Sequence, residues 1–362
     1  MVDTKNSNKK SAKAPWAGRG LWIAAGIAVL VAILAVYQFR NATGFHWTDF
    51  FSTFVRVDWR WLTASVILML LTFWGRAFRW EVMLRPLTPN PSLWNVTSAT
   101  VIGFTAIVLL GRAGEVVRPY LISVKERVKF SSQMAAWILE RIFDLLLVLL
   151  IFGIALARLP PGLHVGPALA WVLRTGGYFI ATIGAVCLLL LVAFRNFGDT
   201  AHRRIMGALS SLPERFSTRI EKILQAFIQG MQCTRDPRFL ALLIIYTILE
   251  WVVIVAAYYC MFRALPATDR FGLDEVMIFL GFVAFGSVVQ VPGIGGGMQA
   301  ASVLVLTEIF GISAGEAWGT AMLIWLLSWV IIVPFGLVFA HRERISWRRI
   351  SHISEDVEAG GT

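Results

Sequence analysis

Apolar runs of roughly twenty residues recur along nearly the whole chain, separated by short polar or proline-containing segments. An α-helix rises about 1.5 Å per residue, so a run of this length can cross the hydrocarbon core of a bilayer. Six runs predict full membrane spans, at residues 21–39, 61–84, 134–156, 171–194, 240–262 and 317–340. The pattern therefore predicts an all-α polytopic membrane protein.

Two further apolar stretches are interrupted by glycine-rich breaks. Residues 94–110 are barely long enough to cross and lead into "GRAGE" at 111–115, while 274–291 and 298–310 flank "PGIGGG" at 292–297. Both flanks of the first stretch are basic, and the positive-inside rule places both on the cytoplasmic side. We therefore predict two re-entrant hairpins. Eight full spans is the alternative if each hairpin crosses the membrane.

The two halves of the chain resemble each other. A shift of 182 residues aligns Gly111 with Gly293 and Gly114 with Gly296, and it superimposes residues 61–156 on 240–340. Each half then consists of a span, a broken hairpin and a span, and one further span lies between the halves. This order predicts an inverted-topology internal repeat, an architecture typical of transporters whose site lies near the midplane.

Composition agrees with a membrane protein and limits the classes of function. The chain is 57% hydrophobic and 15% charged, whereas soluble domains carry about 25% charged residues. We predict a basic head at 1–20, one transmembrane domain at 21–340 and a tail at 341–362. This division leaves no soluble catalytic domain, and the three scattered cysteines lack a metal-binding spacing. We therefore expect no enzyme activity, no catalytic residue, no metal and no cofactor.

The net charge of +11 collects in the flanks and in residues 195–238. Basic segments of this kind remain in the cytoplasm and contact anionic lipid, so we expect both termini inside a bacterial inner membrane and no nucleic-acid partner. Residues 195–238 also predict an amphipathic helix, which lies either on the inner leaflet or against the helical bundle. Arg76, Arg79 and Arg85 are interpreted as the cytoplasmic end of the span at 61–84.

Charged side chains gather at the first break and in the span after it. Glu140 and Asp144 share one face of a helix because they lie four residues apart, and the helix is expected to begin near a Ser131 or Ser132 cap. Two interpretations remain open: a buried ion network that fixes the hairpin to the helix, or an anion site for a lipid phosphate, which arginine binds well. The candidate binding residues are Arg112, Glu115, Arg118, Glu140, Arg141 and Asp144.

The glycines of the two breaks predict hinges or a backbone anion nest. The candidates are Gly111, Gly114, Pro292, Gly293, Gly295, Gly296, Gly297 and Gln299. Glu250 and Glu308 are isolated acids within apolar segments, and packing in the protonated form is the expectation for both.

The motifs "GRAGEVVR", "ERIFD" and "VPGIGGGMQ" resemble those of the lysylphosphatidylglycerol synthase transmembrane region family across residues 20–340. Gln299 stands where that family usually has glutamate. The resemblance implies a lipid translocase whose cargo is an anionic or aminoacylated phospholipid or a polyprenyl-type lipid, with a biosynthetic enzyme as a possible partner. The alternative is a non-transporting membrane scaffold for a lipid or envelope biosynthetic enzyme.

Overall fold

The structure is a computed structural model that describes residues 46–158, 167–194, 236–287, 290–291 and 295–343. The predicted head at 1–20 and span at 21–39 lie outside these residues, as does nearly all of the predicted tail at 341–362 and of the predicted amphipathic segment at 195–238. Within the described ranges the chain is almost entirely helical, as the apolar pattern predicts.

The described elements follow the order of the two predicted halves. The first half contains α2 (Trp47–Val55), α3 (Trp59–Leu84), α4 (Leu93–Leu110), the 3₁₀ turn η1 (Gly111–Val116), α5 (Val117–Lys125) and α6 (Phe130–Arg158). After α7 (Pro167–Phe194), the second half contains α10 (Pro237–Arg263), α11 (Leu273–Gly286), β1 (Gln290–Val291), β2 (Gly295–Gly296), α12 (Gly297–Leu304), the π-helical turn η4 (Val305–Ile309) and α13 (Ala314–Arg342).

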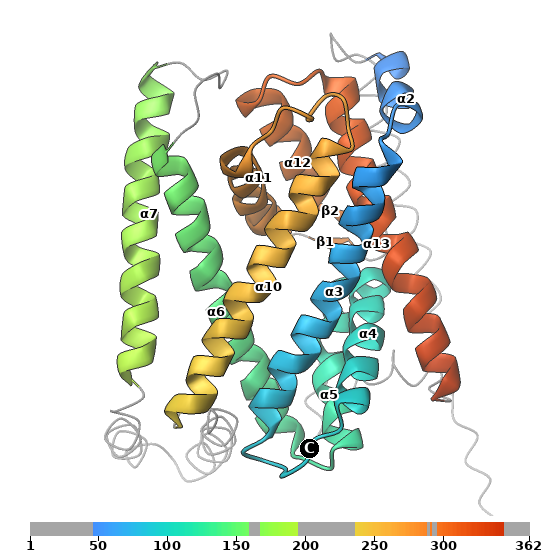
Figure 1. The fold of residues 1–362 in the computed structure, drawn as a ribbon, viewed down its shortest axis with the longest axis vertical. Helices are drawn as coiled ribbons and strands as arrows, with labels where there is room; N and C mark the ends of the chain where they lie inside the picture. The colour runs from blue at the N-terminus through green and yellow to red at the C-terminus, as the bar shows by residue number, and fades with distance from the viewer. Residues whose placement is uncertain (1–45, 159–166, 195–235, 288–289, 292–294, 344–362) are drawn as a thin grey trace, which may run out of the picture. The chain divides into compact units, whose positions relative to one another are not determined.

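Long helices pack in pairs along the bundle. α3 lies along α10, α6 along α7, and α13 against α4 (Figure 1). Four helical stretches of the described chain are long and apolar enough to cross a membrane, at Trp59–Leu84, Leu93–Lys125, Arg238–Arg263 and Ala314–Arg342. The protein is therefore an integral membrane protein. α6 carries three charged residues near its centre, Glu140, Arg141 and Asp144, and the first and last of them are buried.

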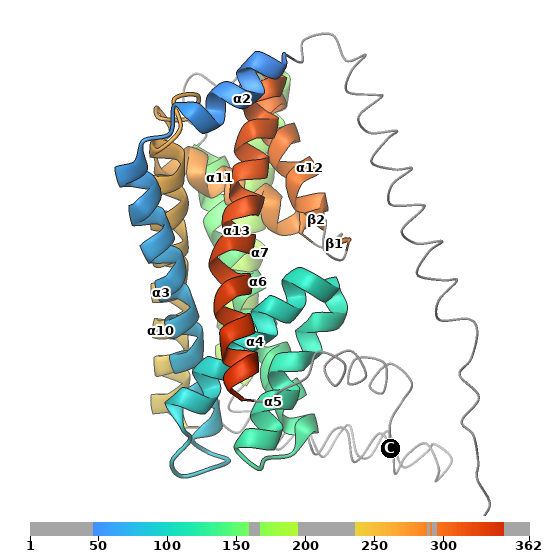
Figure 2. The same cartoon turned by 90° about the vertical axis from the view of Figure 1, so that its right-hand side faces the viewer.

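The stretch Leu93–Lys125 is a hairpin of two helices. α4 ends at Gly111, whose φ of 65° suits glycine, and α4 then packs against η1 and α5 (Figure 2). A Cβ atom at Gly103 would lie 2.6 Å from the Cβ of Arg118. The close packing of the two arms confirms the predicted break at "GRAGE".

The second break forms a short antiparallel β-ladder, which the all-α prediction missed. Gln290 pairs with Gly296 and Val291 with Gly295. Gly296, which ends β2 and precedes α12, has a φ of 119°, a conformation that L side chains rarely adopt. β1 contacts η1, and Arg112 Nη2 donates a hydrogen bond to the carbonyl of Ser287 at 3.4 Å. The two breaks therefore meet each other, as Figure 2 shows.

The predicted serine cap is wrong. α6 begins at Phe130, ahead of Ser131 and Ser132, so neither serine caps it; the Ser132 hydroxyl instead donates to the carbonyl of Lys129 at 2.7 Å. A proline disfavours a helical backbone at the residue before it, and Pro119 follows Arg118. Both residues nevertheless lie in the first turn of α5, where a proline has no intrahelical N–H bond to lose.

A glycine in α13 permits close contact with α4. A Cβ atom at Gly336 would lie 1.8 Å from Oγ1 and 2.5 Å from Cβ of Thr105. Gly336→Ala should therefore lower the apparent unfolding temperature in detergent, by an amount that corresponds to about 1–3 kcal/mol of overpacking. Thr105→Gly in the same chain should restore part of the loss. Gly176→Ala is the control, because its Cβ would meet no atom within 4 Å.

Candidate functional site

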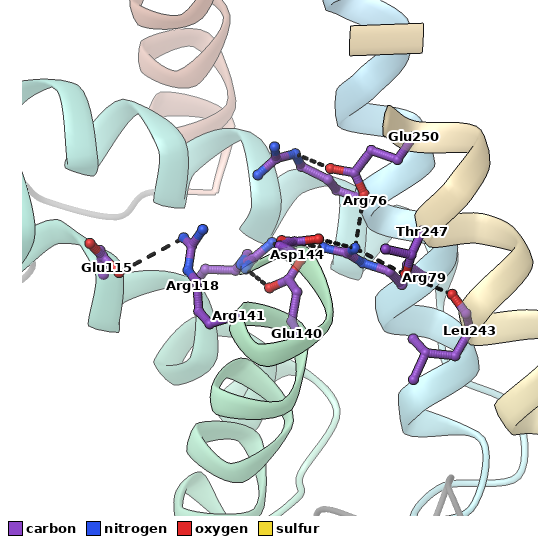
Figure 3. Close-up of polar contacts among 10 residues, drawn as sticks. All are labelled: Arg76, Arg79, Glu115, Arg118, Glu140, Arg141, Asp144, Leu243, Thr247 and Glu250. Carbon is purple, nitrogen blue, oxygen red and sulfur yellow. Dashed lines mark hydrogen bonds and ion pairs between the residues drawn. The ribbon is translucent and has the colours of Figure 1, made fainter. Parts of the chain in front are cut away.

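Arg79 on α3 lies at the centre of a buried ion network. Its side chain is 0% exposed, and Nη1 and Nη2 donate to the two Asp144 oxygens at 2.6 and 3.0 Å. Nη2 also donates to Glu140 Oε1 at 2.5 Å. Figure 3 shows these side chains converging from α3 and α6. Arg79 thus bonds both carboxylates that the sequence placed on one face of α6.

Arg118 on α5 completes the network from the side of the hairpin. Its guanidinium donates to both carboxylate oxygens of Glu140 and lies over the rings of Trp80 and Phe104, with Cζ 4.5 and 5.4 Å from their centroids. Glu140 is therefore held between Arg79 and Arg118. This bridge ties the first hairpin to α3 and α6.

Glu250 on α10 joins the network through two ion pairs. Its oxygens lie 2.8 Å from Arg76 Nε and 3.3 Å from Arg79 Nη1, and its side chain is 1% exposed. Three arginines thus face three carboxylates in a largely buried network, in which Arg76 and Asp144 keep 17% and 12% exposure. Such a network tolerates burial only while its charges stay balanced.

A cavity of about 750 Å³ lies beside this network and is lined by residues of both halves. Most of its wall is apolar, with contributions from α3, α4, α6, α10, α11 and α13. The charged residues that reach it are Arg76, Arg112, Glu115, Arg141 and Asp144. The cavity is therefore amphipathic, with its charge concentrated next to the first break.

The cavity rim carries an excess of positive charge. Arg112 Nη1 lies 3.4 Å and Arg141 Nη2 lies 3.8 Å from the carboxylate of Glu115, so two arginines share one acid. Their side chains are 52% and 39% exposed. Among the residues that the structure describes, the rim and the buried network together contain five arginines and four carboxylates. This arrangement favours an anionic ligand.

The structure brings the six predicted binding residues together but divides them between two environments. Arg112, Glu115, Arg141 and Asp144 line the cavity. Arg118 and Glu140 are not among its lining residues; they are buried beneath it and serve the network. Arg118 and Glu140 form the ion pair that joins the first hairpin to α6, whereas binding of a lipid phosphate stays a prediction.

Three residues of this site were missed by the sequence analysis. Arg79 is fully buried and bonds Asp144 and Glu140, so it belongs to the site, while its place at the cytoplasmic end of the span stays a prediction. Arg76, from the same predicted flank, pairs with Glu250 and lines the cavity. The expectation that Glu250 is isolated is wrong, because Glu250 forms ion pairs with Arg76 and Arg79. The available signal was the one-turn spacing of Arg76 and Arg79 within an apolar run, because charges in such runs need partners.

The glycines have local structural roles. Gly111 has a positive φ at the turn, and Gly114 allows η1 to lie close to the backbone of α4. The N–H of Gly296 already donates to Gln299 Oε1 at 2.7 Å, which caps α12. Gly295 lies in β2 and Gly297 begins α12, whereas Pro292 and Gly293 lie outside the described residues. The hinge and anion-nest roles stay predictions.

Comparisons with known proteins agree with the motifs. Residues 22–336 match the family described as the lysylphosphatidylglycerol synthase TM region. The glycosyltransferase AglD of Haloferax volcanii is 24% identical over 196 residues, which cover 49% of this chain and 31% of that protein. The chain thus spans about a third of the length of this curated relative. No solved structure matches the chain.

Proposed function

Because this chain belongs to the lysylphosphatidylglycerol synthase transmembrane region family, a membrane family of lipid metabolism, we propose that it is a lipid translocase. In this proposal it moves a phosphate-bearing lipid between the leaflets of the bacterial inner membrane, with both termini in the cytoplasm. The cargo crosses without chemical change, so the protein acts as a transporter and not as an enzyme. The cargo class is an anionic or aminoacylated phospholipid or a polyprenyl-type lipid.

One observation carries this proposal: an apolar cavity with arginines at its rim, placed where the two halves meet. The apolar wall suits acyl chains, and the guanidinium groups of Arg112 and Arg141 suit a phosphate. Glu115 serves as their counter-ion until the headgroup replaces it. The buried network of Arg79, Glu140 and Arg118 holds the rim in position.

The proposal also assigns the membrane arrangement. α4–η1–α5 and α11–β1–β2–α12 are re-entrant hairpins of an inverted repeat, and their broken tips meet inside the membrane. What supports this assignment is the matching order of elements in the two halves and the contact of β1 with η1. Non-helical backbone at membrane depth must be buried in protein or line a wet cavity, and η1 lies beside the charged rim.

A flipping assay tests the proposal. The full chain is reconstituted in phosphatidylcholine vesicles that contain a fluorescent phosphatidylglycerol, and dithionite then quenches the outer-leaflet probe. We expect wild type to move the inner-leaflet probe to the outer leaflet, where dithionite quenches it. Arg112→Ala and Arg141→Ala should slow this quenching about tenfold or more, because each removes a charge-assisted contact.

Arg85→Ala is the matched control. Arg85 is an exposed arginine that pairs with Glu81 one turn away on α3 and does not line the cavity. Its removal should leave the rate unchanged. Rates in wild type no faster than in protein-free vesicles, or full rates in both rim variants, would contradict the proposal.

A further inference from the structure

Arg76 lies between the buried network and the cavity. Its Nε is 2.8 Å from Glu250 Oε1, its side chain is 17% exposed, and its guanidinium lies over the ring of Phe104 with Cζ 4.6 Å from the centroid. Arg79 and Arg118 do not line the cavity, but Arg76 does. It is therefore the arginine of the buried network that reaches the space where a ligand would lie.

The two terminal nitrogens of Arg76 are available to a ligand. Within the described part of the chain, neither Nη1 nor Nη2 has a hydrogen bond to a protein atom. Figure 3 shows this end of the guanidinium directed away from Glu250. A guanidinium held at Nε presents two parallel donors, the geometry that binds a phosphate through two oxygens. The two terminal nitrogens of Arg76, which lie beside an apolar cavity, are therefore suited to bind an oxyanion.

We infer that Arg76 is a phosphate ligand of this cavity and that Glu250 is its positioning residue, an inference that rests on the proposed function. The ligand chemistry is a phosphate oxyanion, supplied by a lipid headgroup or by free phosphate. Arg112 and Arg141 approach the same cavity from η1 and α6, whereas Arg76 belongs to α3. A bound phosphate would thus connect the α3–α10 pair to the first hairpin.

Glu250 suits the positioning role because its other contacts are weak. Both of its oxygens are buried, and neither accepts a well-aligned hydrogen bond from the described residues. Arg79, 3.3 Å away, is already engaged by Asp144 and Glu140. The ion pair with Arg76 Nε is therefore the main contact of the Glu250 carboxylate, and it fixes the direction of the fork.

Ligand binding to the purified full chain in detergent tests this inference. The probe is dihexanoylphosphatidylglycerol, and the readout is tryptophan fluorescence, since Trp137 and Trp251 line the cavity. Arg76→Gln should raise Kd about tenfold or more, the factor carried by one charge-assisted hydrogen bond. Glu250→Gln should also raise Kd. The double variant should bind no more weakly than Arg76→Gln alone, because Glu250 acts through Arg76.

Glu308→Gln is the control, since Glu308 is an exposed acid on η4 outside the cavity. Arg76→Lys, which keeps the charge but lacks the fork, repeats the test if the glutamine variant does not fold. Displacement of the lipid by inorganic phosphate would identify free phosphate as a ligand, and a lack of displacement would identify the lipid headgroup.

Two outcomes separate the inference from the proposed function. An unchanged Kd in Arg76→Gln and Arg76→Lys, with flipping still lost in Arg112→Ala, would overturn the inference alone. A Kd for the double variant well above that of Arg76→Gln would overturn the positioning role of Glu250. Wild type that binds the lipid through Arg76 but does not flip it would leave the inference standing and contradict the proposed function.

Discussion

Arg79→Met should lower the stability of the protein by about 3–5 kcal/mol, the cost of breaking a buried ion pair. Arg79 bonds Asp144 and Glu140 and lies 3.3 Å from Glu250. Without it, three carboxylates share two arginines, and two of these carboxylates, Glu140 and Glu250, are only 1% exposed. The apparent unfolding temperature in detergent, followed by tryptophan fluorescence, should fall steeply, and the yield of folded protein should fall with it.

A second substitution shows whether charge imbalance causes this loss. The double variant Arg79→Met/Asp144→Asn again has equal numbers of positive and negative charges in the network. Its loss of stability should therefore be smaller than the sum of the losses in the two single variants. Arg85→Met, at an exposed pair on the same helix, should change the unfolding temperature little. A fall in Arg79→Met no larger than in Arg85→Met would show that the network does not stabilise the fold.

Helix positions followed from local pattern, and so they were predictable. The break at Gly111 ends an apolar run too short to cross comfortably, and the structure turns the chain there. In contrast, the second break combines a ladder that pairs Gln290 with Gly296 and a positive φ at Gly296. Neither property leaves a periodic signal in the sequence, so the second break was predicted only as a loss of helix.

The site was predictable where its residues share one helix. Glu140 and Asp144 lie one turn apart, and that spacing placed both carboxylates on one face of α6. Their main partner, Arg79, is separated from them by 61 and 65 residues. Arginine near the end of an apolar run also satisfies the positive-inside rule. Only the ion pairs of Arg79 with residues of α6 and α10 identify it as a buried donor.

Gly114→Ala should be nearly as destabilising as the loss of Arg79, for a steric reason. A Cβ atom at this position would lie 2.3 Å from the carbonyl carbon and oxygen of Ala106 and 2.5 Å from the N of Ile107. All three atoms belong to the backbone of α4, so no side-chain rotation relieves the clash. The arms of the hairpin must separate, at about 3 kcal/mol or more of overpacking strain.

Gly75→Ala provides the matched control, because a Cβ atom at Gly75 would meet nothing within 4 Å. Gly75 lies inside α3, where alanine stabilises a helix relative to glycine by up to about 1 kcal/mol. The unfolding temperature of Gly75→Ala should therefore equal or exceed that of wild type. The Gly114→Ala clash also moves η1, which carries Arg112 and Glu115. The Gly114→Ala variant should therefore lose both stability and flipping activity. Normal stability in that variant would show that the arms of the hairpin do not pack as closely as described.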